Sequence, residues 1–129
     1  MSRGNAGPEL RGHSTDCHFT LADERDGIVA VLEASGELDM AAAPGLRERL
    51  NAAIDDGCTS IVVDLSQVTF IDSLSMATIV RARTRLGDQG RLALVASHPY
   101  VLLIVQAGGL GSVLELFESR HEALAYAHA

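Results

Sequence analysis

The chain has 129 residues, a length that suits one domain and that can bury a core without a metal or a disulfide. Its apolar share is 47%, supplied mostly by aliphatic side chains. The formal net charge of −7, from 17 acidic and 10 basic residues, argues against a nucleic-acid partner, because affinity for a phosphate backbone comes largely from Lys and Arg.

The first 16 residues are rich in Gly, Ser, Pro and charge, and they predict a flexible tail followed by one domain over residues 17–129. The tail lacks the apolar core of a signal peptide. No apolar stretch approaches the roughly 20 residues of a membrane span. Cys17 and Cys58 are expected to be free thiols. We therefore expect a cytoplasmic protein that does not contact a membrane.

The first part of the domain predicts two strands and a helix. Apolar and polar residues alternate over 17–21, as in a half-buried strand, and the letters DERDG that follow predict a turn. Residues 28–34 predict an antiparallel partner strand, which ends at Gly-Glu-Leu-Asp. Asp39 is a predicted N-cap for the next helix, with Pro44 near its first turn.

The middle of the chain predicts a strand, a helix and a second strand. Residues 60–65 are short, β-branched and apolar, as in a buried central strand, and a further apolar stretch leads to Asp72 and Ser73. A helical period then runs from Ser73 to Leu86. Residues 91–96 predict the next buried strand.

The last part predicts a helix that begins near Pro99, a short strand over 113–117 and a final helix over 120–127 with Leu124 as its main apolar contact. The element order is thus β-β-α-β-α-β-α-β-α. This order predicts a single α/β domain whose mixed β-sheet has about four helices packed mainly on one side.

Catalytic and metal-binding motifs are not supported by the spacing of the polar residues. The sequence has no Gly-x-Ser-x-Gly elbow and no phosphate loop. Three of the five histidines lie in or near the termini, which disfavours a catalytic triad. One N-terminal cluster has metal-ligand residue types but matches no closed zinc site: His13, Asp16, Cys17 and His18. We expect a binding protein without catalysis, metal or cofactor.

Asp72 and Ser73 stand at a junction between a loop and a helix. A phosphate on Ser73 would meet the unpaired N–H groups and the positive potential of the helix N-terminus. It would also add about −1.5 to −2 charge beside Asp72 and so repel an acidic partner. A simpler interpretation is that Asp72 or Ser73 only caps the helix.

Three segments together resemble a bacterial STAS domain of the anti-sigma factor antagonist type. They are GELDMAAAPGLRERL, IVVDLSQVTFIDS and RLALVASHPYVLLIVQAGGLGSVLELFES, and the resemblance runs from about Phe19 to Ala127. It implies a partner that is both anti-sigma factor and serine kinase, of the histidine-kinase-like ATPase type. It also implies that this kinase phosphorylates Ser73, that a PP2C-type phosphatase reverses the reaction, and that the free chain is a monomer.

The resemblance further implies a partner-binding surface at Asp39, Asp72, Ser73, Leu74, Ser75 and Met76. Here the chain departs from the pattern Asp-Ser-x-Gly-Leu, because Ser75 holds the glycine position and Met76 the leucine position. Ser75 is therefore a possible alternative phosphoacceptor, and the domain could also bind constitutively without a switch. The same fold would equally serve a STAS scaffold or a lipid-transporter accessory subunit. A nucleotide-binding protein is a candidate from another functional class.

Overall fold

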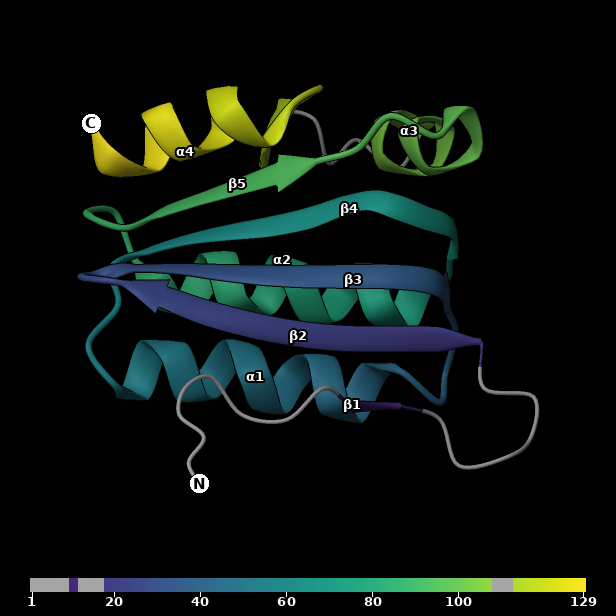
Figure 1. The fold of residues 1–129 in the computed structure, drawn as a ribbon, viewed down its shortest axis with the longest axis horizontal. Coiled ribbons are helices and arrows are strands. Elements are labelled where there is room, and N and C mark those ends of the chain that lie inside the picture. The colour runs from purple at the N-terminus through teal and green to yellow at the C-terminus, as the bar shows by residue number, and fades with distance from the viewer. Residues whose placement is uncertain (1–9, 12–17, 108–112) are drawn as a thin grey trace.

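The computed structural model describes residues 10–11, 18–107 and 113–129. The described part contains one mixed sheet and four helices (Figure 1). The elements in chain order are β1 (Leu10–Arg11), β2 (Phe19–Asp26), β3 (Val29–Leu38), α1 (Ala43–Asp55), β4 (Ser60–Ile71), α2 (Ser73–Leu86), β5 (Arg91–Val95), α3 (Pro99–Ala107), β6 (Glu115–Phe117) and α4 (Arg120–His128).

The predicted element order is confirmed, with β1 in addition. The strands lie in the sheet in chain order; β1, β2 and β3 are antiparallel, and β3 to β6 run parallel. β1 belongs to the segment predicted as a tail, where it pairs with β2 through Leu10 and Leu21. The rest of that segment lies outside the described residues.

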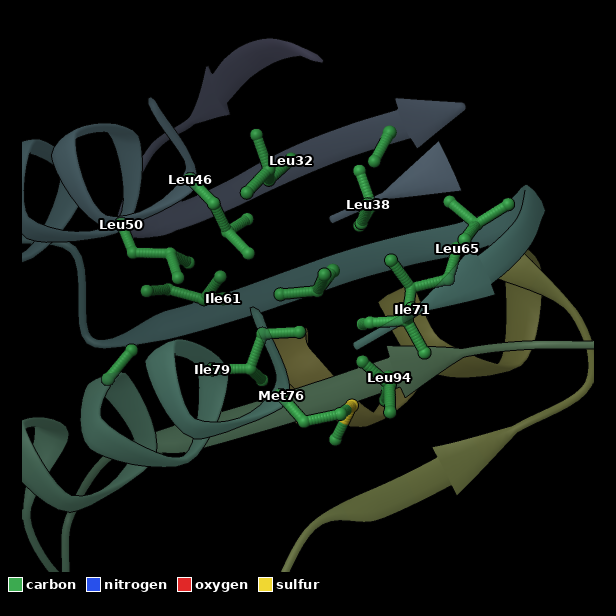
Figure 2. Close-up of a cluster of buried hydrophobic side chains, with 14 of the residues drawn as sticks. Leu32, Leu38, Leu46, Leu50, Ile61, Leu65, Ile71, Met76, Ile79 and Leu94 are labelled. Atoms are coloured by element: carbon green, nitrogen blue, oxygen red, sulfur yellow. The ribbon is translucent and has the colours of Figure 1, made fainter. Parts of the chain in front are cut away.

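Two apolar clusters fill the two faces of the sheet. On β3, Leu32 points into the larger cluster and the neighbouring Val31 into the smaller one, as the two-residue period of a strand requires. The larger cluster contains buried side chains of α1, α2 and α3. Figure 2 shows Leu46 of α1 and Ile79 of α2 directed toward the strands. Among the described helices, only α4 covers the opposite face, so the helices do lie mainly on one side.

α4 packs through small side chains. Ala123 and Ala127 are buried against the sheet, whereas Leu124, predicted as the main apolar contact, is only half-buried. Leu124 does pack against the smaller cluster, but it is not the main contact of α4, because the buried positions of the helix are alanines. In the structure two alanines, four residues apart on one helix face, meet the strands.

β2, β3 and β4 are longer than predicted, whereas β5 ends at Val95 and β6 begins only at Glu115, so these two strands are shorter than predicted. β2 continues through Asp23 to Asp26 and pairs with β3 over its full length, so only the last residue of DERDG lies in a turn. The chain reverses at Gly27 and Ile28, where Gly27 has a φ of 65°. Charged residues are tolerated in β2 because they are paired, as Arg49 of α1 is with Asp23. The two apolar stretches on either side of Ser66 form one strand, β4.

Gly36 explains how β3 extends to Leu38. Its φ is +85°, and a Cβ at this position would collide with the carbonyl oxygen of His18. The backbone N–H of Glu37 donates to that same carbonyl oxygen at 2.7 Å. The glycine therefore permits a close approach that carries β3 past His18 toward Asp39.

Asp39 does not cap α1. Ala42 occupies the N-cap position with helical backbone angles and forms no side-chain cap hydrogen bond. Asp39 lies earlier, where its Oδ1 accepts from the backbone N–H of Ala41 at 3.0 Å and closes a turn over residues 40–42. The prediction missed this extra turn. Pro44 does lie in the first turn of α1.

Candidate functional site

The candidate site forms where β3 and β4 end side by side. The parallel register pairs Leu38 with Ile71, so the next residues, Asp39 and Asp72, leave the sheet at the same edge. The backbone N–H of Asp72 donates to the carbonyl oxygen of Leu38 at 3.0 Å. Two segments far apart in the chain are thereby brought together at the carboxyl ends of two neighbouring strands.

Asp72 is the N-cap of α2. Its backbone is extended, with φ −95° and ψ 175°, and its Oδ1 accepts from the backbone N–H of Ser75 at 2.8 Å. This satisfies one of the N–H groups that a helix N-terminus leaves without an intrahelical partner. The capping role thus belongs to Asp72, and Ser73, the first residue of α2, is exposed.

Ser75 is fully buried, with 0% of its surface exposed. Its Oγ lies 3.2 Å from the carbonyl oxygen of Leu38 and 3.4 Å from that of Asp39, so the hydroxyl can donate to either. In place of the motif glycine, this residue ties the first turn of α2 to the end of β3. Ser73 and Ser75, two residues apart, therefore occupy opposite environments.

Exposed apolar side chains flank Ser73. Leu74 is 48% exposed and Met40, in the turn before α1, is 72% exposed. They line a shallow hollow of about 170 Å³ between α1 and α2. Exposed apolar residues that gather at one place are typical of a protein-binding surface. Met40 was not among the predicted partner-binding residues. Its position directly after Asp39 was the only signal in the sequence that it could belong to this surface.

A larger apolar groove of about 670 Å³ opens on the other side of Ser73, between α2 and α3. Met76, one of the predicted partner-binding residues, is only 3% exposed and lies in the wall of this groove. Phe70 and Tyr100 stack at its edge with ring centroids 5.6 Å apart. The first turn of α2 therefore lies between this groove and the hollow that contains Met40 and Leu74.

His18 is a second residue of the site that the sequence did not reveal. Its Nε2 lies 3.0 Å from Oδ2 of Asp39, and both side chains are partly exposed. The other members of the N-terminal cluster, His13, Asp16 and Cys17, lie outside the described residues. Within the described part, no group of three or more His, Cys, Asp or Glu side chains is placed to hold a metal ion.

Asp64 is a buried carboxylate on the face of the sheet that α4 covers. Burial raises its pKa, but hydrogen bonds from Ser66 and the ion pair with Arg120 outweigh that effect and hold the pKa of Asp64 below its ordinary value. The backbone N–H of Ser66 donates to Oδ1 at 2.9 Å, and Nε of Arg120 donates to Oδ2 at 2.9 Å. Arg120 also pairs with Glu33 at 3.0 Å. This carboxylate has a structural role.

The thiol of Cys58 is free and buried. Burial raises the pKa of Cys58, and the nearby Arg25 only partly opposes this rise. A thiol with a raised pKa is a poor nucleophile near neutral pH.

Comparison with known proteins agrees with this geometry. The family model of the STAS domain matches residues 20–123. The anti-sigma-F factor antagonist RsfB of Mycobacterium tuberculosis is 30% identical over 105 residues, which cover 81% of this chain and 84% of RsfB.

Solved structures of similar proteins have the same fold. An anti-sigma factor antagonist from Mycobacterium paratuberculosis has a TM-score of 0.80 at 28% identity and covers 86% of this chain and 95% of its own. SpoIIAA in its unphosphorylated form has a TM-score of 0.71 at 27% identity, covering 84% and 96% of the two chains. SpoIIAA of Bacillus in its phosphorylated form has a TM-score of 0.66 at 25% identity, covering 82% and 97%.

Among the described residues, none of the helices combines the length and the apolar character that crossing a bilayer requires.

Proposed function

The chain belongs to the STAS domain family, and we propose that it works as an anti-sigma factor antagonist. In this role it binds an anti-sigma factor and so frees a sigma factor for transcription. Phosphorylation of Ser73 releases the anti-sigma factor. The chain acts by binding and catalyses no reaction itself.

The exposure of Ser73 between Asp72 and Leu74 is the observation that carries this proposal. A kinase needs an accessible hydroxyl, and a binding partner needs accessible apolar surface beside it. Met40 and Leu74 supply that apolar surface. The similarity to SpoIIAA, a protein that exists in unphosphorylated and phosphorylated forms, supports the same role.

A phosphate at Ser73 would leave the fold intact and disturb the interface. The side chain is exposed, and the N-terminus of α2 favours negative charge by about 0.3–1 kcal/mol. The same phosphate adds about −1.5 to −2 charge beside Asp72, and burying that charge against Leu74 in an interface is costly. Modification therefore acts on the partner contact and not on folding.

We assign the phosphoacceptor role to Ser73 and not to Ser75. The hydroxyl of Ser75 is buried and donates to the backbone at the end of β3, so a kinase would have to unfold the first turn of α2 to reach it. The proposed partner is an anti-sigma factor that is itself an ATP-binding serine kinase of the histidine-kinase-like type. A PP2C-type phosphatase would restore the binding form.

A titration tests the proposal. The purified chain is added to each anti-sigma factor of the ATP-binding serine-kinase type that the same genome encodes, and complex formation is followed by calorimetry. We expect one of them to bind the wild-type chain and Ser73→Ala, and to bind Ser73→Asp more weakly. The absence of a complex with every such protein would contradict the proposal and favour a scaffold or transporter-accessory role.

A further inference from the structure

The described arginine side chains differ in whether they make an ion pair or a hydrogen bond. Among the arginines whose side chains the structure describes, six make ion pairs or hydrogen bonds: Arg25, Arg49, Arg83, Arg85, Arg91 and Arg120. Arg47 of α1 and Arg81 of α2 are exposed, and within the described residues neither side chain has an ion pair or a hydrogen bond.

These two arginines line one groove. Arg47 and Arg81 both border the hollow of about 170 Å³ that contains Met40 and Leu74. Both also border an adjoining hollow of about 250 Å³ farther along the same two helices, and Thr78 lies in both hollows. We call the two hollows together the α1–α2 groove. One end of it contains Met40 and Leu74, the residue after Ser73, and both of its hollows are lined by Arg47 and Arg81.

The charge of this groove is opposite to that of the whole chain. The net charge is −7, yet the described side chains that line the α1–α2 groove include three arginines and no carboxylate. One of the three, Arg85, is already paired with Asp55. The other two, Arg47 and Arg81, remain available for a partner. They lie beside the exposed apolar side chains of Met40 and Leu74, and together they form a surface that is complementary to carboxylates.

We propose that the α1–α2 groove binds an acidic segment of the anti-sigma factor, with carboxylates of that segment on Arg47 and Arg81 and an apolar side chain between Met40 and Leu74. This inference rests on the proposed function and names the chemistry of the partner at the same site. It also explains the direction of the switch. A phosphate on Ser73, next to Leu74, repels the same carboxylates that the two arginines attract.

Charge reversal of the two arginines tests the groove. The anti-sigma factor that binds the wild-type chain is titrated with Arg47→Glu/Arg81→Glu, with each single variant and with Arg83→Glu as a control. Arg83 lies on the same helix as Arg81, and neither hollow includes it. Each single variant changes the net charge by the same amount as Arg83→Glu. Thermal unfolding of every variant checks that the fold is retained.

We expect the double variant to bind about tenfold or more weakly than the wild type, chiefly through a lower association rate. The two single variants should each fall between the double variant and Arg83→Glu. Raising the salt from about 0.1 M to about 1 M shortens the Debye length from about 10 Å to about 3 Å, and should slow wild-type association more than that of the double variant.

The outcomes separate the two proposals. If the double variant binds as tightly as Arg83→Glu while Leu74→Asp abolishes binding, the acidic-segment inference is wrong and the proposed function stands. If the wild-type chain binds none of the anti-sigma factors, the proposed function fails, and the inference fails with it.

Discussion

Ser75 is the residue whose environment bears most directly on the site of phosphorylation. We expect Ser75→Asp to lower the free energy of unfolding by several kcal/mol, because it places a carboxylate in a fully buried position. Ser75→Ala should cost only about 1 kcal/mol, the value of one hydrogen bond. Ser73→Asp is the matched control and should stay within about 0.5 kcal/mol of the wild type. Urea unfolding measures all three, and equal stability of the two Asp variants would contradict the assignment.

Asp72 should act on α2 through its cap geometry. Asp72→Ala removes the acceptor of the Ser75 N–H and should cost about 1 kcal/mol in the free energy of unfolding. Asp72→Asn keeps a side-chain oxygen at the same place and should cost much less. The two variants are compared by thermal unfolding. An equal loss in both would mean that the charge of Asp72 matters and the cap does not.

At the level of single residues, the cap of α2 could be predicted from the sequence, whereas the contact between His18 and Asp39 could not. Capping at the start of α2 was foreseen, because Asp72 stands directly before a helical period that runs from Ser73 to Leu86, and that helix is confirmed. The pairing of His18 with Asp39 joins residues 21 positions apart and depends on the close approach at Gly36. No local pattern reports such a contact.

At the scale of secondary structure, the docking of α4 depends on its small residues. Ala123 is fully buried against the sheet, and Ala125 of the same helix is exposed. We expect Ala123→Leu to lower the free energy of unfolding by about 1–3 kcal/mol through overpacking, and Ala125→Leu to leave it nearly unchanged. Urea unfolding of the pair checks this. Similar stabilities would show that α4 is free to move away from the sheet.

The ion pair between Asp64 and Arg120 should make the docking of α4 depend on pH. The pKa of Asp64 is lowered from its ordinary value of 3.8 in the folded chain. Its contribution to stability is therefore fully present above that value, and it is lost as the pH falls through the folded pKa.

Asp64→Asn provides the comparison for this pH effect. The wild type should be more stable than Asp64→Asn at neutral pH, and the gap should narrow as the pH falls below about 4. Urea unfolding of both proteins across this range measures the gap. A gap that stays constant down to about pH 2 would contradict the role of the Asp64 carboxylate.

The elements differ in how far the sequence predicts them. The helical period of α2 is local, so both of its ends were predicted. The ends of β2 and β3 were not, because Asp23 and Glu24 are polar in sequence but continue a ladder with β3. Strand length depends on pairing partners that are distant in the chain. α1 begins after an additional turn at residues 40–42, which Asp39 stabilises.

At the scale of the whole molecule, the sheet brings the parts of the site together. Asp39 and Asp72 follow neighbouring parallel strands, and this arrangement was implied by family resemblance and not by local pattern. The α1–α2 groove could not be predicted at all, because Arg47 and Arg81 share it only after α1 and α2 pack together. The element order predicted the mixed sheet with helices mainly on one side, and α4 on the opposite face is the exception among the described helices.

Ser73 is the exposed residue whose phosphorylation we propose to control binding. The most direct measurement is intact-mass analysis with peptide mapping after incubation with ATP and the anti-sigma kinase that binds the chain, on the wild type, Ser73→Ala and Ser75→Ala. We predict a single phosphate that is absent from Ser73→Ala and retained in Ser75→Ala, and a phosphorylated chain that no longer binds the kinase. A phosphate that persists in Ser73→Ala, or a phosphorylated chain that binds as tightly as before, would show that Ser73 does not control binding.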